Sequence, residues 1–162
     1  MDQDSGIIRR LPPPMPPDAE PPKINERNVL QVLVNLNDQL RVKGQTIEIA
    51  ELRAITKEFL SNPYGDPHKS EQEEKEFPFL GRVMVSKGVV SLQNDNGTSY
   101  EMYIMVQNEL TAAFNELRDE MSRKHFGVTF ANLRNDDMRE SIQQAIRVSI
   151  SEAEPRDIGG RR

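Results

Sequence analysis

The sequence predicts an α+β fold, in which a mixed β-sheet carries two main helices on one face and follows a flexible proline-rich leader. Residues 28–36 and 89–94 form strand-like runs that are apolar enough to lie in the middle of a sheet. Two other segments each carry a single apolar stripe at three- and four-residue spacing, which is typical of helices that cover a sheet. Seven of the eleven prolines fall within the first 22 residues, ahead of all these elements.

The composition limits the chemistry that the chain can perform. Its 162 residues include no Cys, which excludes a disulfide scaffold, a thiolate zinc site and a thiol nucleophile. Only His68 and His125 are available for a histidine-based metal or catalytic site. The formal net charge of -5 argues against a nucleic-acid-binding protein, which usually carries a basic patch. We therefore expect no cofactor, no metal ion and no nucleic-acid partner.

Residues 1–27 are interpreted as a proline-rich linker ahead of the folded domain. Proline fixes the backbone angle φ and donates no backbone hydrogen bond, so residues 11–22 predict a polyproline-like spacer that stays outside the core. The alternative is a docking peptide for an SH3-like groove. Proline-rich segments are commonly linkers, which favours the spacer.

A β-hairpin and a helix are predicted next. Residues 28–36 are rich in Val and Leu on both alternating faces, so we expect this strand to be buried on both sides. Asn37-Asp38 is turn chemistry, and residues 39–43 return as a second strand that ends at Gly44. A helix follows over residues 49–60, and the Asn62-Pro63 pair ends it because the residue before a proline avoids the α region.

Residues 64–76 are predicted to be a solvated loop, with His68 exposed. Their acidic run could be read as a carboxylate metal cage, but loops that bind hard cations need turn residues between the carboxylates. Residues 81–95 then read as a second β pair with a tight turn at Lys87-Gly88. The Asn96-Gly97-Thr98 tripeptide matches a glycosylation sequon, although a turn explains it fully.

The longest predicted helix begins at Thr98 or Ser99, either of which is a good N-cap, and runs to about His125. Gly127 is the expected C-terminal stop. The apolar stripe of this helix is typical of core packing rather than of a cofactor site. Across the whole domain we expect a core that includes Leu33, Phe59, Leu92, Leu110, Phe114 and Leu117.

The C-terminal part is predicted to contain a short helix and an edge strand. Asn135 can cap a helix that reaches about Gln144. Beyond it, Ile146, Val148 and Ile150 alternate with polar residues, which indicates a half-buried strand at a sheet edge. The folded domain is thus expected to span residues 28–155, with a tail over residues 156–162. The outward-facing side chains predicted to contact a partner are Arg147, Ser149 and Ser151.

No catalytic motif is recognisable in the chain. It has no Gly-rich phosphate loop, no nucleophile elbow, no zinc-ligand spacing and no plausible catalytic triad. We therefore expect a binding or scaffold domain rather than an enzyme. There is also no run of about 20 apolar residues that could span a membrane and no secretory signal, so the sequence read alone is typical of a soluble cytoplasmic protein.

Several segments resemble the ExbD/TolR family, and the match covers nearly the whole chain. In residues 90–101 (VSLQNDNGTSYE), a strand ends in a polar residue and an Asp, and a short turn then leads to a Tyr-containing helix start. Asp95, Tyr100 and Glu101 occupy those places. The hairpin-to-helix passage 40–52 is similar to the family's as well. The segments that look especially like ExbD proteins of Bacteroidota are 6–13 (GIIRRLPP), 107–120 (QNELTAAFNELRDE) and 150–155 (ISEAEP).

This resemblance implies the periplasmic domain of a single-pass inner-membrane protein. Family members carry one N-terminal membrane helix whose aspartate takes part in proton passage; they work with ExbB and pass energy to TonB, which opens outer-membrane transporters. Position 1 falls where that helix ends, so we expect the helix and the proton-carrying aspartate to be encoded upstream. Asp2 and Asp4 are not that aspartate, since they lie in polar sequence.

The resemblance implies a mechanical role: a homodimer that contacts TonB and joins ExbB only through the membrane helix. The residues implied to transmit or limit movement are those of the linker, Ile7, Ile8, Leu11 and Pro12. Two other interpretations stay open. One is a TolR-like subunit of the Tol-Pal envelope system, which shares this fold and motor. The other is a cytoplasmic adaptor whose proline-rich head docks on partners.

Overall fold

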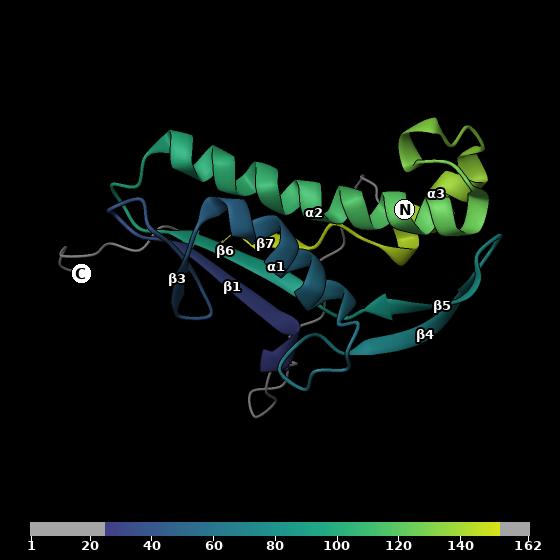
Figure 1. The fold of residues 1–162 in the computed structure, drawn as a ribbon, viewed down its shortest axis with the longest axis horizontal. Coiled ribbons are helices and arrows are strands. Elements are labelled where there is room, and N and C mark those ends of the chain that lie inside the picture. The colour runs from purple at the N-terminus through teal and green to yellow at the C-terminus, as the bar shows by residue number, and fades with distance from the viewer. Residues whose placement is uncertain (1–24, 153–162) are drawn as a thin grey trace, which may run out of the picture.

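A five-stranded mixed sheet forms the base of the molecule. The computed structural model describes residues 25–152, and its strand order in this sheet is β3-β2-β1-β6-β7 (Figure 1). The central strands β1 (Val29–Val34) and β6 (Val89–Asn94) run parallel. Antiparallel β2 (Leu40–Val42) and β3 (Gln45–Ile47) extend the sheet on one side, and β7 (Ile150–Glu152) pairs parallel with β6 on the other. The predicted α+β class is confirmed.

The predicted hairpin is present, with a further strand beyond it. A short 3-10 turn, η1 (Glu26–Asn28), leads into β1, and β2 returns antiparallel beside it. Gly44 does not end this unit as expected. Lys43 and Gly44 both adopt positive φ, which is the geometry of a tight hairpin turn, and the chain continues directly into β3.

Two helices, α1 (Ile49–Ser61) and α2 (Tyr100–Phe126), lie on the same side of this sheet (Figure 1). The ends of α2 were predicted closely. The Ser99 side chain accepts a hydrogen bond from the Met102 amide, and Gly127 adopts the left-handed conformation just beyond the helix. The main core lies between this helix layer and the sheet; its buried members are Leu30, Val32, Val34, Leu40, Val42, Leu52, Phe59, Leu60, Val90, Leu92, Val106, Leu110 and Phe114.

Strand β1 is buried on one face only, contrary to the sequence prediction. Leu30, Val32 and Val34 point into the core, whereas Val29 and Leu33 are only half-buried. The reason is that both long helices cover the same face, and no helix among the described residues covers the other. Leu117, also expected in the core, is half-buried where it packs against the main cluster.

The loop after α1 is held more tightly than its composition suggested. Asn62, in the left-handed conformation, donates from Nδ2 to the carbonyls of Asp66 and Ser70 at 3.0 and 2.9 Å. The buried Ser70 hydroxyl donates to the carbonyl of Phe59 at 2.8 Å. His68 is exposed, as expected. This loop therefore closes the C-terminal end of α1 with specific hydrogen bonds.

Two sequence predictions about the middle of the chain are wrong. The acidic run lies in a strand, β4 (Gln72–Phe77), rather than in a loop, and β4 pairs antiparallel with β5 (Gly81–Ser86) as a separate two-stranded sheet. Consequently β5 and β6 are not a hairpin. Lys87-Gly88 instead carries the chain from the small sheet to the main one, where the two apolar strands β6 and β1 pair over six residues each.

A second, smaller core joins this hairpin to the C-terminal helix. The short turn η2 (Phe130–Asn132) and helix α3 (Asp136–Ala145) pack near the end of α2, beside the β4–β5 hairpin (Figure 1). Asn135 caps α3 as predicted. The buried members of this cluster are Leu80, Val85, Leu133, Ile142 and Ala145. Half-buried Ile146 packs against both cores and so joins them.

The terminal strand is shorter than predicted. Only β7 is paired, and Val148, which was expected to face the core, is 44% exposed. Residues 146–149 instead cross from α3 to the sheet, and Arg118 donates to the carbonyl of Ile146 at 2.9 Å. The linker residues Ile7, Ile8, Leu11 and Pro12 lie outside the described residues, as do the domain boundary at 155 and the tail 156–162.

Candidate functional site

The outer edge of β7 is the strongest candidate for a working surface. β7 pairs with β6 in the register Val90↔Ile150 and Leu92↔Glu152, and within residues 25–152 no strand pairs with its other side. Such an edge presents a row of backbone donors and acceptors that another strand can use. The predicted position of the C-terminal strand at a sheet edge is thus confirmed.

The direction of the backbone groups identifies which residues serve that edge. The Val90 amide donates to the carbonyl of Ser149 at 2.8 Å, so Ser149 directs its backbone toward β6. Backbone direction alternates along an extended chain, so Ser151 does the same, whereas Ile150 and Glu152 direct their N–H and C=O groups outward. The free edge therefore consists of backbone groups of Ile150 and Glu152.

The three side chains predicted for partner contact do not form one surface. Arg147 is exposed and Ser149 is half-buried, and both line a groove beside α2 and β5. Ser151 is exposed within β7 and does not line that groove. The prediction assumed a continuous strand from Ile146, and the early departure of residues 146–149 from the sheet separates these positions.

A polar cluster that the sequence did not reveal holds β7 to α2. The amide nitrogen of Gln107 donates to the hydroxyl of Tyr103 at 3.2 Å and also to the Glu152 carboxylate. Burial, together with the nearby Glu152 carboxylate, raises the pKa of Tyr103 to about 12. The available signal was the four-residue spacing of Tyr103 and Gln107, which places them on one helix face. Nothing in the sequence linked them to Glu152.

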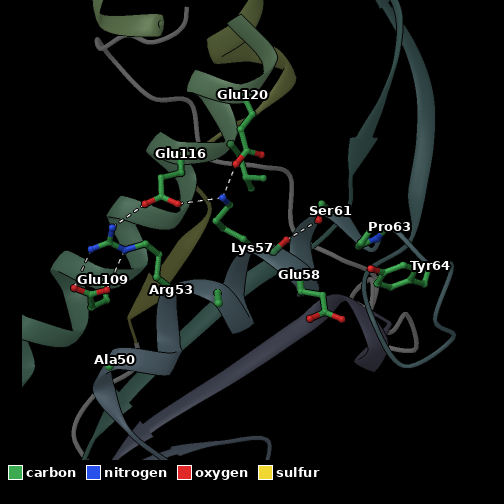
Figure 2. Close-up of a pocket in the computed structure, with 12 residues that line it drawn as sticks. Ala50, Arg53, Lys57, Glu58, Ser61, Pro63, Tyr64, Glu109, Glu116 and Glu120 are labelled. Carbon is green, nitrogen blue, oxygen red and sulfur yellow. Dashed lines mark hydrogen bonds and ion pairs between the residues drawn. The ribbon is translucent and has the colours of Figure 1, made fainter. Parts of the chain in front are cut away.

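A second depression, of about 730 Å³, lies over the contact between α1 and α2 (Figure 2). Arg53 donates to both oxygens of Glu109 at 3.1 and 3.2 Å and to Glu116 at 2.7 Å. Lys57 reaches Glu116 at 3.0 Å and also contacts Glu120. We refer to these five side chains as the ion-pair ladder.

Every charged side chain of the ladder contacts one of opposite charge, which favours a structural role. Hydrogen bonds from Arg53 and Lys57 lower the pKa of Glu116, and those to Glu109 and Glu116 raise the pKa of Arg53. A general acid or base needs a pKa near the working pH. These shifts move the pKa values of Arg53 and Glu116 further from neutral pH. The ladder therefore fastens one helix to the other.

The acidic run takes part in structural contacts and does not form a site of its own. Within residues 25–152, no three His, Asp or Glu side chains gather as a potential metal site. In the acidic run, Glu71 accepts a hydrogen bond from Asn28 at 2.9 Å, and Glu73 pairs with Lys75 at 3.6 Å. None of the helices in the described part is long and apolar enough to cross a membrane.

Comparison of the chain with models of protein families and with curated proteins found no match. The β7 edge is therefore assessed from its geometry.

Proposed function

We propose that the chain is the periplasmic domain of an ExbD subunit in the proton-driven ExbB–ExbD–TonB motor, which energises transport through outer-membrane transporters. In this role the domain forms a homodimer and contacts TonB. A membrane helix ahead of Met1 anchors it in the inner membrane, carries the proton-bearing aspartate and joins ExbB. The domain itself performs no covalent chemistry and transmits movement.

The strand-to-helix passage of the ExbD-like segment supports this proposal. β6 ends at Asn94, and the buried Asp95 donates its amide to the carbonyl of Val34 at 2.9 Å, which ties the turn to β1. Tyr100 and Glu101 then begin α2. This hydrogen bond holds the turn between β6 and α2 against β1. A turn held in this way can pass a displacement from the sheet to the helix without deforming first.

The observation that carries the proposal is the outer edge of β7. An exposed edge can accept an extended peptide as an additional strand, whose backbone hydrogen bonds supply much of the affinity. The same edge can also meet its counterpart in a second copy around a two-fold axis. Because Tyr103 and Gln107 hold Glu152 in place, the edge is already arranged before a partner arrives.

A matched pair of variants tests this edge in the 162-residue chain. Glu152→Pro deletes an outward N–H, whereas Glu152→Ala removes the same carboxylate and keeps the N–H. We expect Glu152→Pro to bind the periplasmic region of the cognate TonB about tenfold more weakly than Glu152→Ala, as measured by fluorescence anisotropy. Sedimentation equilibrium should show weaker self-association of the Pro variant as well.

Two results would contradict the proposal, and they differ in meaning. Equal binding and self-association of the two variants would show that β7 is not the working edge. A parent chain that neither binds TonB nor is preceded in its gene by about 20 apolar residues with one Asp would refute the motor assignment itself.

A further inference from the structure

A groove of about 520 Å³ lies beside the β4–β5 hairpin, where the hairpin meets α2 and the chain that follows α3. One wall is β5, another is the C-terminal half of α2, and the third is the chain from Ala145 to Ser149. It lies where the two hydrophobic cores meet, because Ile146 packs against both of them. The apolar side chains of its walls include Val83, Leu117, Met121 and Ile146.

The groove exposes a free strand edge. Five consecutive residues of β5, 82–86, line it, whereas a strand that presents only one face would contribute every second residue. Within the described part of the chain β5 pairs only with β4. The Lys87 amide donates to the carbonyl of Glu71 at 2.9 Å, so the backbone groups of Lys87 point toward the β4 side. Along an extended strand, the backbone groups of successive residues point alternately to its two sides. Arg82, Met84 and Ser86 therefore direct their backbone N–H and C=O groups away from β4.

The rim of the groove is positively charged, in a chain whose net charge is -5. The cationic side chains that line it are Arg82 of β5, Lys124 of α2 and Arg147 of the chain between α3 and β7. Among the described residues, no ion pair engages Lys124 or Arg147, and Arg82 has only an exposed contact with Glu74 at 3.8 Å. The single carboxylate in the lining, Glu120, is already paired with Lys57. The groove thus attracts negative charge.

We propose that this groove binds an extended acidic peptide segment of a partner protein, which adds to β5 as a third strand. The free edge of β5 would bond its backbone, the apolar walls would take alternate side chains, and the cationic rim would pair with carboxylates between them. Met84 and Met121 suit such a surface, since methionine adapts to different apolar side chains. This site is separate from the β7 edge and does not depend on the motor assignment.

Two alternative ligands fit these observations less well. An amphipathic helix has no use for a free strand edge, because its own backbone groups are already bonded. A lipid-like anion would satisfy the rim and the walls but would leave the edge of β5 unpaired. The peptide is the ligand that uses all three features together.

The experiment uses an acetylated, amidated hexapeptide of alternating Glu and Val, added to the ¹⁵N-labelled 162-residue chain. We expect chemical-shift changes that concentrate in residues 82–86 and 145–149. The same peptide with Lys in place of Glu should bind at least about tenfold more weakly, since the rim repels it. Shift changes confined to β7, or equal binding of the two peptides, would overturn the proposal.

Matched variants separate the contributions of the backbone and the rim. Met84 is 56% exposed, so Met84→Ala loses little packing and keeps the outward N–H, whereas Met84→Pro deletes it. We expect Met84→Pro to weaken binding about tenfold relative to Met84→Ala. If Met84→Pro does not fold, the double variant Lys124→Glu/Arg147→Glu decides: it should reverse the preference between the Glu and Lys peptides. An unchanged preference contradicts the proposal.

A final experiment tests whether residues 1–24 of the same chain occupy the groove. Deletion of residues 1–24 should leave the affinity for the Glu peptide unchanged within about threefold. If the deletion raises that affinity tenfold or more, and the deleted segment added as a peptide competes for the same residues, the leader is the occupant and the partner proposal is wrong.

Discussion

Gly88 is a residue whose importance lies in the absence of a side chain. A Cβ at this position would lie 2.9 Å from a ring carbon of Phe59 and 2.9 Å from the Cβ of Ser70. Both neighbours are buried, so neither can move away freely. We expect Gly88→Ala to lower the free energy of unfolding by about 1–3 kcal/mol, as measured by urea denaturation.

The adjacent exposed residue provides the control for this prediction. Lys87→Ala changes a side chain in the same connection without touching the Phe59–Ser70 contact, and it should change stability by less than about 0.5 kcal/mol. If the two variants prove equally stable, the chain does not pass as closely beneath α1 as the geometry requires.

Tyr103 makes the stability of the protein depend on alkaline pH. Its folded-state pKa is raised to about 12, mainly by burial, whereas an unfolded tyrosine titrates near about 10. The folded state therefore holds its proton more tightly, and the resulting stability is present below about pH 10 and declines as the pH rises toward about 12. We expect Tyr103→Phe to reduce this decline, measured as the difference between urea unfolding curves at pH 9 and pH 11.

Only the difference between the variant and the parent is informative here, because lysines also titrate in this range. Parallel curves for the parent and Tyr103→Phe would contradict the shift.

At the residue scale, the sequence predicted helix ends well and partner contacts poorly. Ser99, Gly127 and Asn135 act within one helical turn, so their roles can be read from neighbouring residues. The roles of Arg147 and Ser149 depend on where the chain leaves the sheet. Packing between distant elements decides that point, and no local pattern encodes it.

Among the elements, α2 contributes Val106, Leu110 and Phe114 to the main core. The Leu110 side chain is fully buried against the sheet, as its place in the apolar stripe predicted. We expect Leu110→Ala to cost about 2–5 kcal/mol of unfolding free energy, from lost burial and the cavity left behind. Met105→Ala, on the exposed side of the same helix, should cost far less when both are measured by thermal denaturation. Comparable losses would refute the helix register.

The ion-pair ladder illustrates what helical periodicity leaves out. Both helices could be predicted from their apolar stripes, but Arg53 and Glu109 are 56 positions apart in the chain. The pairing of α1 with α2 is a tertiary fact that sequence spacing alone does not contain. The same holds for β4, whose charged residues read as loop and become a strand only because β5 lies beside them.

At the scale of the whole molecule, the fold class could be predicted and the topology could not. Short separation between β5 and β6 suggested a hairpin, yet β6 pairs parallel with β1, about 60 residues earlier in the chain. The sequence contained the reason in the apolar character of both strands. The sequence alone does not decide whether β6 pairs with β5 or with β1. That depends on tertiary packing, because β5 packs in the second core.

The parallel arrangement of β1, β6 and β7 determines how the domain responds to tension. β1 and β7 run in the same direction on either side of β6, so the described chain enters the sheet at one end of these strands and leaves it at the other. A pull applied at residue 25 and at residue 152 is directed along the strands. It loads the inter-strand hydrogen bonds together in shear, whereas a hairpin pulled at its two adjacent ends opens one bond at a time, like a zipper. The sheet therefore resists extension most strongly along the direction that joins residue 25 to residue 152.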